Sequence, residues 1–213
     1  YACISCLAHH FGRIVDCLRD RGQLENTIII FAGDNGLSLG DHGLMGKQNL
    51  YEFGGMHVPL VVAGPGMHPG TSDAFVYLFD LFPTICQMTH VQVPVAVEGK
   101  SFAPLLAGQP FMAREFMFNA YKNVQRSFRD ERWKVIRYPQ INRTQLFDLA
   151  NDPHELNDLA DQPAQRGKIA ELMDRMVTAQ RDWGDTCPLT SANPAPAAWS
   201  PEMLKPAAPG GPR

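Results

Sequence analysis

Apolar residues recur every three to four positions near the start of the chain, within residues 2–22. This stripe consists of Ile4, Leu7, Phe11, Ile14, Val15 and Leu18. The spacing is typical of an amphipathic helix whose charged residues lie on the opposite side. Gly22 marks the C-terminal end of this helix, with Arg19 and Arg21 just before it. Glycine commonly ends a helix, and cations are favourable in the last turn.

Two short apolar runs follow this helix. Residues 27–32 (TIIIFA) and 58–62 (VPLVV) are rich in β-branched side chains and do not alternate with polar ones. Such runs are typical of strands that are covered on both faces. The first run is followed at once by the polar sequence at residues 33–36 (GDNG). A helix, a turn, a buried strand and then polar residues indicate an α/β domain, in which ligands bind beyond the carboxyl ends of the strands.

The segment that connects the two strands is long and rich in glycine. Residues 36–57 contain glycine at positions 36, 40, 43, 46, 54 and 55. Ordered loops of this length inside a compact domain are usually functional. Beyond the second strand, residues 76–88 (VYLFDLFPTICQM) predict a short helix that begins or breaks around Pro83.

The pattern changes from about residue 112. Short segments with partial alternation of apolar and polar residues cover 115–120, 124–129, 133–138 and 145–148. They predict an antiparallel sheet with one solvated face, followed by a helix over 163–183. We therefore divide the chain into an α/β part at 1–111, a small α+β subdomain at 112–183, and a Pro- and Ala-rich tail at 184–213. The tail has little to bury and is expected to be mostly disordered.

Composition excludes some classes of function. The net charge is −3, and no basic run could supply the phosphate contacts on which nucleic-acid binding depends. No apolar stretch approaches the roughly 20 residues of a membrane span. Apolar residues make up 45% of the chain and charged residues 19%, as is ordinary for a globular protein. The oligomeric state is left open by the sequence.

The cysteines do not form a recognisable framework. They lie at positions 3, 6, 17, 86 and 187, an odd number without the spacing of a disulfide scaffold. Cys3, Cys6, His9 and His10 resemble a zinc ligand set, but no second ligand pair follows at the spacing of a zinc finger. We interpret Cys3 and Cys6 as small packing residues of the first helix.

Asp34 and Asn35 are the candidate metal ligands. Two adjacent oxygen donors at the end of a strand, with glycine on either side, suit a hard divalent cation such as Ca²⁺ or Mg²⁺. Taken alone, Asp-Asn-Gly is more often simply a turn. The residues downstream change this interpretation.

The downstream motifs come in a specific order. After Asp34-Asn35-Gly36 the chain contains GDHG at 40–43, GKQNLYE at 46–52, HVPL at 57–60, GPG at 64–66, DLFPT at 80–84, Gln125-Arg126 with Arg129, WKVI at 133–136, LFDL at 146–149 and DPHE at 152–155. This series resembles the sulfatase family, within the alkaline-phosphatase-like superfamily, over about residues 1–180. The resemblance implies the C-terminal part of a mixed sheet between helices, followed by a small α+β subdomain with an antiparallel sheet and a C-terminal helix.

The resemblance also implies roles for individual residues. Asp34 and Asn35 would be two of the protein ligands of a Ca²⁺ ion, with Mg²⁺ as the other option, which polarises the sulfate oxygens. Lys47 would place its ammonium group on the sulfate and offset the charge that builds on the bridging oxygen as the S–O bond breaks.

Four further polar residues lie in this glycine-rich segment. His42 either binds substrate and assists the leaving group, or holds the loop through a hydrogen bond. Asp41 and Glu52 are expected to form hydrogen bonds within the loop rather than to act as acid or base. His57 stands where the family more often has arginine, so no anion-binding role is assigned to it.

The nucleophile of the family is expected outside this sequence. Sulfatases convert a cysteine or serine, in a Cys/Ser-x-Pro/Ala-x-Arg motif, to formylglycine. None of the five cysteines lies in such a motif, and the family's two N-terminal aspartate ligands should lie upstream of Tyr1. We therefore expect this chain to be the C-terminal part of a longer protein, and we expect no turnover of sulfate esters by these residues alone.

The predicted function of the intact protein is metal-dependent hydrolysis of sulfate esters, either sulfated carbohydrates or aryl sulfates. Two alternatives remain: a phosphonate or phosphate ester hydrolase of the same superfamily, and an inactive truncated remnant. The sequence leaves the localisation open, and the family resemblance favours an exported or periplasmic protein.

Overall fold

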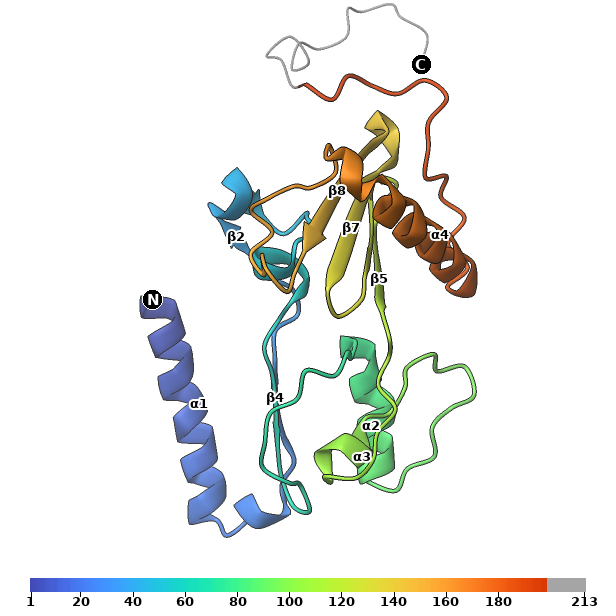
Figure 1. The fold of residues 1–213 in the computed structure, drawn as a ribbon. Helices are drawn as coiled ribbons and strands as arrows, with labels where there is room; N and C mark the ends of the chain where they lie inside the picture. The colour runs from blue at the N-terminus through green and yellow to red at the C-terminus, as the bar shows by residue number, and fades with distance from the viewer. Residues whose placement is uncertain (199–213) are drawn as a thin grey trace, which may run out of the picture. The chain divides into compact units, whose positions relative to one another are not determined.

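The computed structural model describes residues 1–198, which form two compact units (Figure 1). The first unit comprises Tyr1–Gly36 and His57–Arg114, and the second comprises Leu37–Met56 together with the residues from Glu115 onward. The division into domains at residue 111 stays a prediction. The compact units differ from it mainly because the glycine-rich loop Leu37–Met56 groups with the second unit.

The first unit contains the predicted N-terminal helix and the two predicted strands. Helix α1 covers Ala2–Asp20, and strands β1 (Ile29–Ala32) and β4 (Leu60–Ala63) pair antiparallel, with Ile29 opposite Ala63. The expectation that both faces of the strands are covered is wrong for the described part of this unit. Residues of β1 are half-buried or exposed, and β4 alternates between half-buried and exposed positions.

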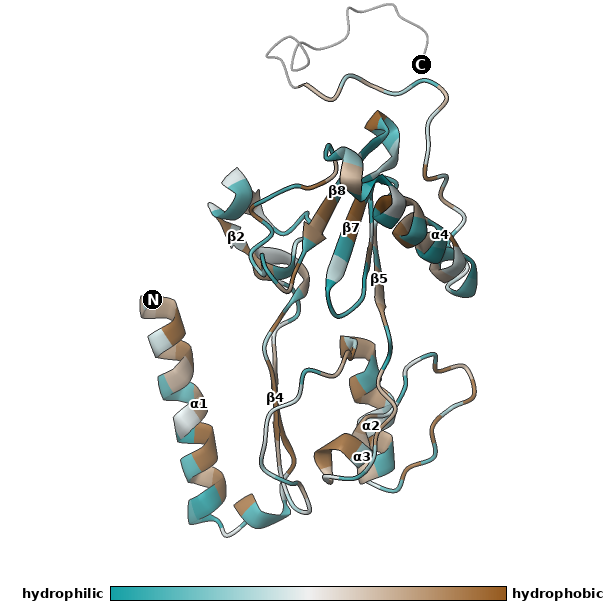
Figure 2. Cartoon of the chain, in the orientation of Figure 1, coloured by the Kyte–Doolittle hydropathy of each residue, from teal (hydrophilic) through white to brown (hydrophobic). Residues whose placement is uncertain are grey.

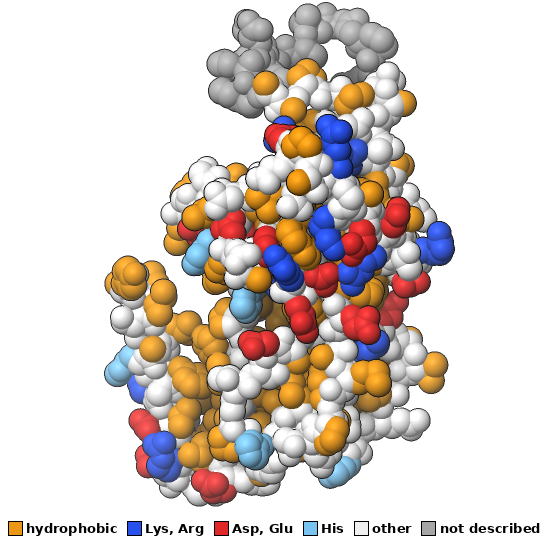
Figure 3. Space-filling view, viewed as in Figure 1, with side chains coloured by type: hydrophobic (Ala, Val, Ile, Leu, Met, Phe, Trp, Pro, Cys, Tyr) orange, Lys and Arg blue, Asp and Glu red, His pale blue; other side chains and the backbone are white. Residues whose placement is uncertain are grey.

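The apolar stripe of α1 is exposed. Leu7 is 54% and Ile14 62% exposed, and within the part of the chain that the structure describes α1 has no buried residue. Figure 2 shows the brown apolar positions along this helix, and Figure 3 shows their side chains at the surface. Cys3 and Cys6 are exposed too, so they do not have the expected packing role. Among residues 1–198, no helix combines the length and apolar character needed to cross a membrane.

The short helix predicted within residues 76–88 is confirmed as α2, Leu81–Met88, preceded by one turn of 3₁₀ helix at Leu78–Asp80. Asp80 is fully buried, and its carboxylate accepts hydrogen bonds from both terminal guanidinium nitrogens of Arg114, at 2.5 and 2.7 Å, and from the backbone N–H groups of Tyr77 and Lys100. This carboxylate therefore joins three separate segments of the first unit.

The second unit is built on the predicted antiparallel sheet. Its strands are β5 (Met117–Tyr121), β6 (Gln125–Arg129), β7 (Trp133–Tyr138) and β8 (Arg143–Asp148), in the order β5-β6-β7-β8. The predicted C-terminal helix is α4, Arg166–Asp182, which packs on this sheet (Figure 1). The core between them consists of Phe118, Phe128, Val135, Leu146, Leu172, Met176 and Ala179.

The second face of this sheet is covered by the glycine-rich loop. Along β7 the side chains alternate, so Val135 packs toward α4 while Ile136 joins a separate cluster with Tyr51, Phe147 and Leu149. Tyr51 belongs to the loop. The expectation of one solvated face is therefore wrong where the loop lies.

The first part of the Pro- and Ala-rich tail is attached to the second unit. Asp185 forms an ion pair with Arg126 at 2.6 Å, Leu189 packs against the core, and the backbone N–H of Ala195 donates to the carbonyl oxygen of Gln140. The expectation that the tail has little to bury does not hold for these residues. Residues 199–213 lie outside the described part of the chain.

Candidate functional site

Asp34 and Asn35 directly follow β1 in the first unit. Gly33 brings this strand end close to its neighbour, because its N–H donates to the carbonyl oxygen of Pro59 at 3.0 Å and an added Cβ would lie 3.2 Å from Cβ of Val58. Asp34 is exposed and Asn35 is half-buried. The amide nitrogen of Asn35 donates to the carbonyl oxygen of Gly36 at 2.8 Å, so its Oδ1 is the oxygen left for another partner.

This pair fits a hard divalent cation as part of its ligand set. A carboxylate and an amide oxygen are the donor types that Ca²⁺ and Mg²⁺ prefer. Ca²⁺ takes about 6–8 oxygen ligands, so two side chains supply only a fraction. Within residues 1–198, no three His, Cys, Asp or Glu side chains come together as a metal site.

Lys47 and His42 lie on the glycine-rich loop, in the second unit. The loop contains a small hairpin of β2 (Ser38–Leu39) and β3 (Met45–Gly46) around a turn at Asp41–Gly43. Lys47 is exposed and comes directly after β3. The sequence placed all four candidate residues on one connection. The structure assigns the metal pair to one compact unit and the other two residues to the second.

The loop is fixed just after Lys47. Asn49 is buried, its amide nitrogen donates to the hydroxyl of Ser38 at 2.9 Å, and its Oδ1 accepts from the N–H of Tyr51 at 3.0 Å. Gly54 and Gly55 permit this packing, since added Cβ atoms would lie 2.8 Å from Oγ of Ser38 and 2.4 Å from Oδ1 of Asn49, respectively. The backbone on the C-terminal side of Lys47 is thus held by buried polar contacts.

His42 is held by stacking. Its ring lies parallel to that of Tyr51, with 3.8 Å between centroids and 7° between planes. The backbone of His42 has φ 54°, a left-handed conformation that few residues other than glycine adopt. Tyr51 is itself fixed, because its hydroxyl donates to Oε1 of Gln145 on β8 at 3.0 Å. The stack shows one way in which His42 contributes to the shape of the loop.

The expectation that Glu52 forms hydrogen bonds within the loop is wrong for its carboxylate. It does not bond within the loop, but binds Arg129 of β6 at 2.6 Å and Lys134 of β7 at 2.8 Å. Burial alone would raise the pKa of the Glu52 carboxyl, but the charges of Lys134 and Arg129 hold its pKa below the ordinary value. Glu52 is therefore ionised at neutral pH and joins the loop to the sheet.

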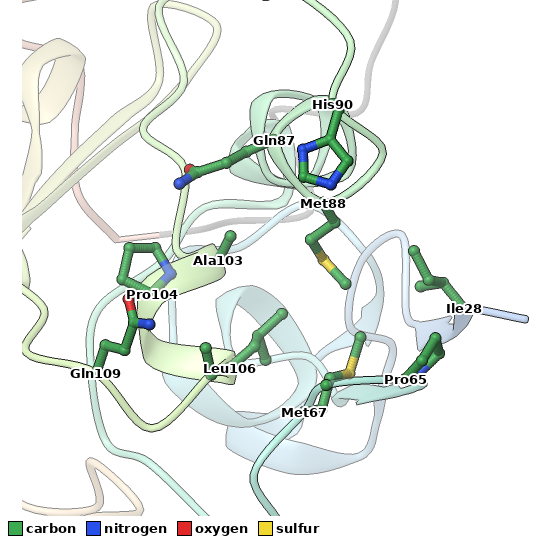
Figure 4. Close-up of a pocket in the computed structure, with 12 residues that line it drawn as sticks. Ile28, Pro65, Met67, Gln87, Met88, His90, Ala103, Pro104, Leu106 and Gln109 are labelled. Carbon is green, nitrogen blue, oxygen red and sulfur yellow. The ribbon is translucent and has the colours of Figure 1, made fainter. Parts of the chain in front are cut away.

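A separate cavity lies in the first unit and is shown in Figure 4. Its volume is about 360 Å³, and mostly apolar side chains line it, among them Ile28, Met67, Met88 and Leu106. His90, Gln87 and Gln109 provide its polar groups. It contains none of the candidate residues at positions 34, 35, 42 and 47.

Comparison with known families gives one match, which includes residues of both compact units. The family described as N-sulphoglucosamine sulphohydrolase, C-terminal, matches residues 40–182. Among curated proteins, a choline-sulfatase of Rhizobium meliloti is 33% identical over 189 residues, which is 85% of this chain but 35% of that protein. This chain therefore spans about a third of the length of that relative.

Solved structures share the fold. A phosphonate monoester hydrolase from Silicibacter pomeroyi is 27% identical with a TM-score of 0.75, and the match covers 84% of this chain and 39% of that one. A structure described as in complex with D-glucosamine-2-N,6-O-disulfate is 24% identical with a TM-score of 0.73, over 87% of this chain and 40% of that chain. These similarities confirm the predicted alkaline-phosphatase-like α/β fold class.

Proposed function

This chain belongs to the sulfatase family, and we propose that the whole protein hydrolyses sulfate esters, with Lys47 binding the sulfate group. The observation that carries the proposal is the fixed loop. The family match includes this loop, whose buried residues Asn49 and Tyr51 hold the segment from which the exposed Lys47 projects. A cation on a rigid support is what stabilisation of a developing anion requires.

Asp34 and Asn35 are proposed as ligands of a divalent ion, Ca²⁺ in the first instance. Sulfatases in general use a divalent metal ion and formylglycine. When bound, such an ion polarises the sulfate oxygens. The contribution of this chain is the Asp34 carboxylate and the Oδ1 of Asn35, which Gly33 allows to sit tightly at the end of β1.

The metal assignment is tested by calcium titration of the whole protein. Asp34→Ala should weaken the binding of Ca²⁺ measured by calorimetry, because a carboxylate ligand is lost. Asp73→Ala is the matched control, since Asp73 is an exposed carboxylate of the same unit. Unchanged Ca²⁺ affinity in Asp34→Ala would contradict the assignment.

Lys47 is tested by kinetics on 4-methylumbelliferyl sulfate. Loss of one donor to a developing oxyanion typically lowers kcat about 10²–10³-fold, so Lys47→Ala in the whole protein should fall in this range. Lys122→Ala is the control, because Lys122 is a lysine of the same unit outside the loop. If Lys47→Ala retained wild-type kcat/KM, the sulfate-binding role would be wrong.

Two variants separate a role of the His42 ring nitrogens, whether toward substrate or in a hydrogen bond of the loop, from a role of the stack on Tyr51. His42→Phe keeps a ring that can stack on Tyr51 but has no nitrogen. His42→Asn suits the left-handed backbone but has no ring to stack. If His42 acts through its nitrogens, both variants lose kcat/KM. If it acts by stacking, only His42→Asn does.

A phosphonate ester hydrolase is the second candidate, favoured by the likeness to the phosphonate monoester hydrolase of Silicibacter pomeroyi. The ratio of kcat/KM for 4-nitrophenyl sulfate to that for 4-nitrophenyl phenylphosphonate decides between the two. A ratio above one supports the sulfatase, and a ratio well below one supports the phosphonate hydrolase.

Sulfated carbohydrates or aryl sulfates are the proposed substrates. The neighbour in complex with D-glucosamine-2-N,6-O-disulfate supports the carbohydrate class. Comparison of kcat/KM for a sulfated glucosamine and for an aryl sulfate tests this choice, because a carbohydrate sulfatase should prefer the sugar.

A further inference from the structure

Four charged side chains form a buried network beneath the glycine-rich loop. Glu52 comes from the loop, Arg129 from β6, Lys134 from β7, and Glu155 from the turn after β8. The nitrogen of Lys134 lies 2.8 Å from Oε1 of Glu52 and 2.8 Å from Oε1 of Glu155. Arg129 lies 2.6 Å from the other oxygen of Glu52. Among these four side chains, two cations face two carboxylates.

Three members of the network, Glu52, Lys134 and Glu155, are buried, and Arg129 is half-buried. Lys134 is 1% exposed, and such a charge is tolerated in an interior only where partners compensate it. Loss of one partner from a buried pair is strongly destabilising, because the remaining charge is left uncompensated. Each member therefore constrains where the others can lie.

The turn that supplies Glu155 is shaped to direct this residue inward. Asp152 accepts hydrogen bonds from the N–H groups of Leu156 and Asn157, and its carbonyl oxygen accepts from the N–H of Glu155. Glu155 adopts φ 55°. Its Oε2 then accepts from the backbone N–H of Glu52 at 2.6 Å, so it binds both the main chain of the loop and the ammonium of Lys134.

The network is attached to the loop close to Lys47 in sequence. Only five positions separate Lys47 from Glu52, and the three buried residues Asn49, Leu50 and Tyr51 lie between them. Through this short, tightly packed segment, the position of Glu52 determines the position of the backbone that carries Lys47. Such a device matters because a displacement of about 1 Å near a reacting group can cost about 100-fold in rate.

We propose that the buried network of Glu52, Arg129, Lys134 and Glu155 is a positioning device that fixes the loop so that Lys47 is presented to the sulfate group. The inference rests on the proposed function of Lys47. It assigns a role to Arg129, Lys134 and the DPHE turn, which until now were motif residues alone, and it gives Glu52 partners on the sheet. None of the four touches substrate in this proposal, so they act through Lys47.

A double-mutant cycle in the whole protein tests this coupling. Lys134→Met keeps the length of the side chain and removes the charge. It should lower kcat/KM for 4-methylumbelliferyl sulfate about 100-fold in the wild-type background. In the Lys47→Ala background the same change should lower it less than about 3-fold, since coupled residues are non-additive. An equal loss in both backgrounds would mean general damage, and would overturn the proposal.

Two further variants keep the test decisive. Glu155→Gln leaves the acceptor for the N–H of Glu52, so it should fold even where Lys134→Met does not, with a smaller loss of about 10-fold in kcat/KM. Arg126→Met is the matched control. It also breaks an ion pair of a buried arginine on the same sheet, but its partner Asp185 lies in the tail. It should lower the melting temperature and leave kcat/KM unchanged.

A second readout does not depend on activity. Hydrogen exchange of the backbone N–H groups of residues 44–52 should accelerate at least 10-fold in Lys134→Met and stay unchanged in Arg126→Met, because only the first change releases the loop. Unchanged exchange would overturn the positioning role. Faster exchange in a protein without sulfatase activity would instead contradict the proposed function alone.

Discussion

The two compact units bury their apolar residues very differently. In the second unit, the sheet β5–β8 has α4 on one face and the glycine-rich loop on the other, and its central side chains Phe128, Val135, Ile136 and Leu146 have no exposed surface. In the first unit, Pro83, Cys86 and Phe102 are the buried apolar residues among those the structure describes. The apolar stripe of α1 and part of β4 are at the surface.

This difference separates two ways of organising a fold. The second unit is stabilised by apolar burial, which is the dominant favourable contribution to folding. The described part of the first unit relies more on directed polar contacts, with the carboxylate of Asp80 as their centre. The contrast predicts that the same substitution has different consequences in the two units.

The largest effect is expected at Asp80. Asp80→Ala leaves the guanidinium of Arg114 and two backbone N–H groups without their acceptor. Breaking such a buried pair costs about 3–5 kcal/mol. Hydrogen exchange of the α2 amides measures this loss in the first unit, and Asp73→Ala, at an exposed position, is the control. Equal exchange in both variants would mean that Asp80 does not hold the unit together.

Truncation of leucine compares apolar burial directly. Leu146 is fully buried and Leu7 is 54% exposed. Leu146→Ala should lower the free energy of unfolding by about 2–5 kcal/mol, while Leu7→Ala should change it by less than about 0.5 kcal/mol, as at most surface positions. Urea unfolding measures both. A large loss in Leu7→Ala would show that the stripe of α1 is covered in solution.

Substitution of glycine by alanine should lower the stability at a position of the second unit and raise it at a position of the first. In Gly55→Ala the new Cβ would lie 2.4 Å from Oδ1 of the buried Asn49, an overpacking that typically costs about 1–3 kcal/mol. Gly12 lies within α1 with nothing within 4 Å of an added Cβ. Gly12→Ala should stabilise α1 by about 0.5–1 kcal/mol. Thermal melting by circular dichroism checks the two signs.

The smallest effect is expected when the ion pair between Asp185 of the tail and Arg126 is lost at low pH. The hydrogen bond from Arg126 lowers the pKa of Asp185 to about 2. The stabilisation by the ionised form is therefore present above the ordinary pKa of about 4 and is lost as the pH falls through about 2. The methyl resonances of Leu189 should shift within this range as the segment detaches. The variant Asp185→Asn should lack this pH dependence, and a shift that persists in it would contradict the assignment.

Much of the secondary structure could be predicted from local pattern. The spacing of Leu7 and Ile14 predicted α1, and the alternation along Trp133–Tyr138 predicted β7 at its observed bounds. Periodicity reports which residues share a face of an element, and this is a property of the chain itself. It does not report whether another element covers that face, as the exposed α1 demonstrates.

The candidate site was predictable in part, for a similar reason. The order of motifs from Asp34 to Glu155 placed the chain in its family, which the match over residues 40–182 confirms. The partners of Glu52 could not be predicted. They lie 77 and 82 positions away in the sequence, and no local pattern relates residues at that separation.

The sequence by itself determined which segments become helix or strand, which family the chain belongs to, and which side chains are candidates for chemistry, because all three depend on residue type and short-range spacing. The tertiary structure alone decided that the glycine-rich loop packs on the distant sheet, that Glu52, Arg129, Lys134 and Glu155 share one buried network, and which apolar faces are covered. The physical reason is that burial and charge pairing are set by contacts between residues far apart in the chain, and these exist only once the chain has folded.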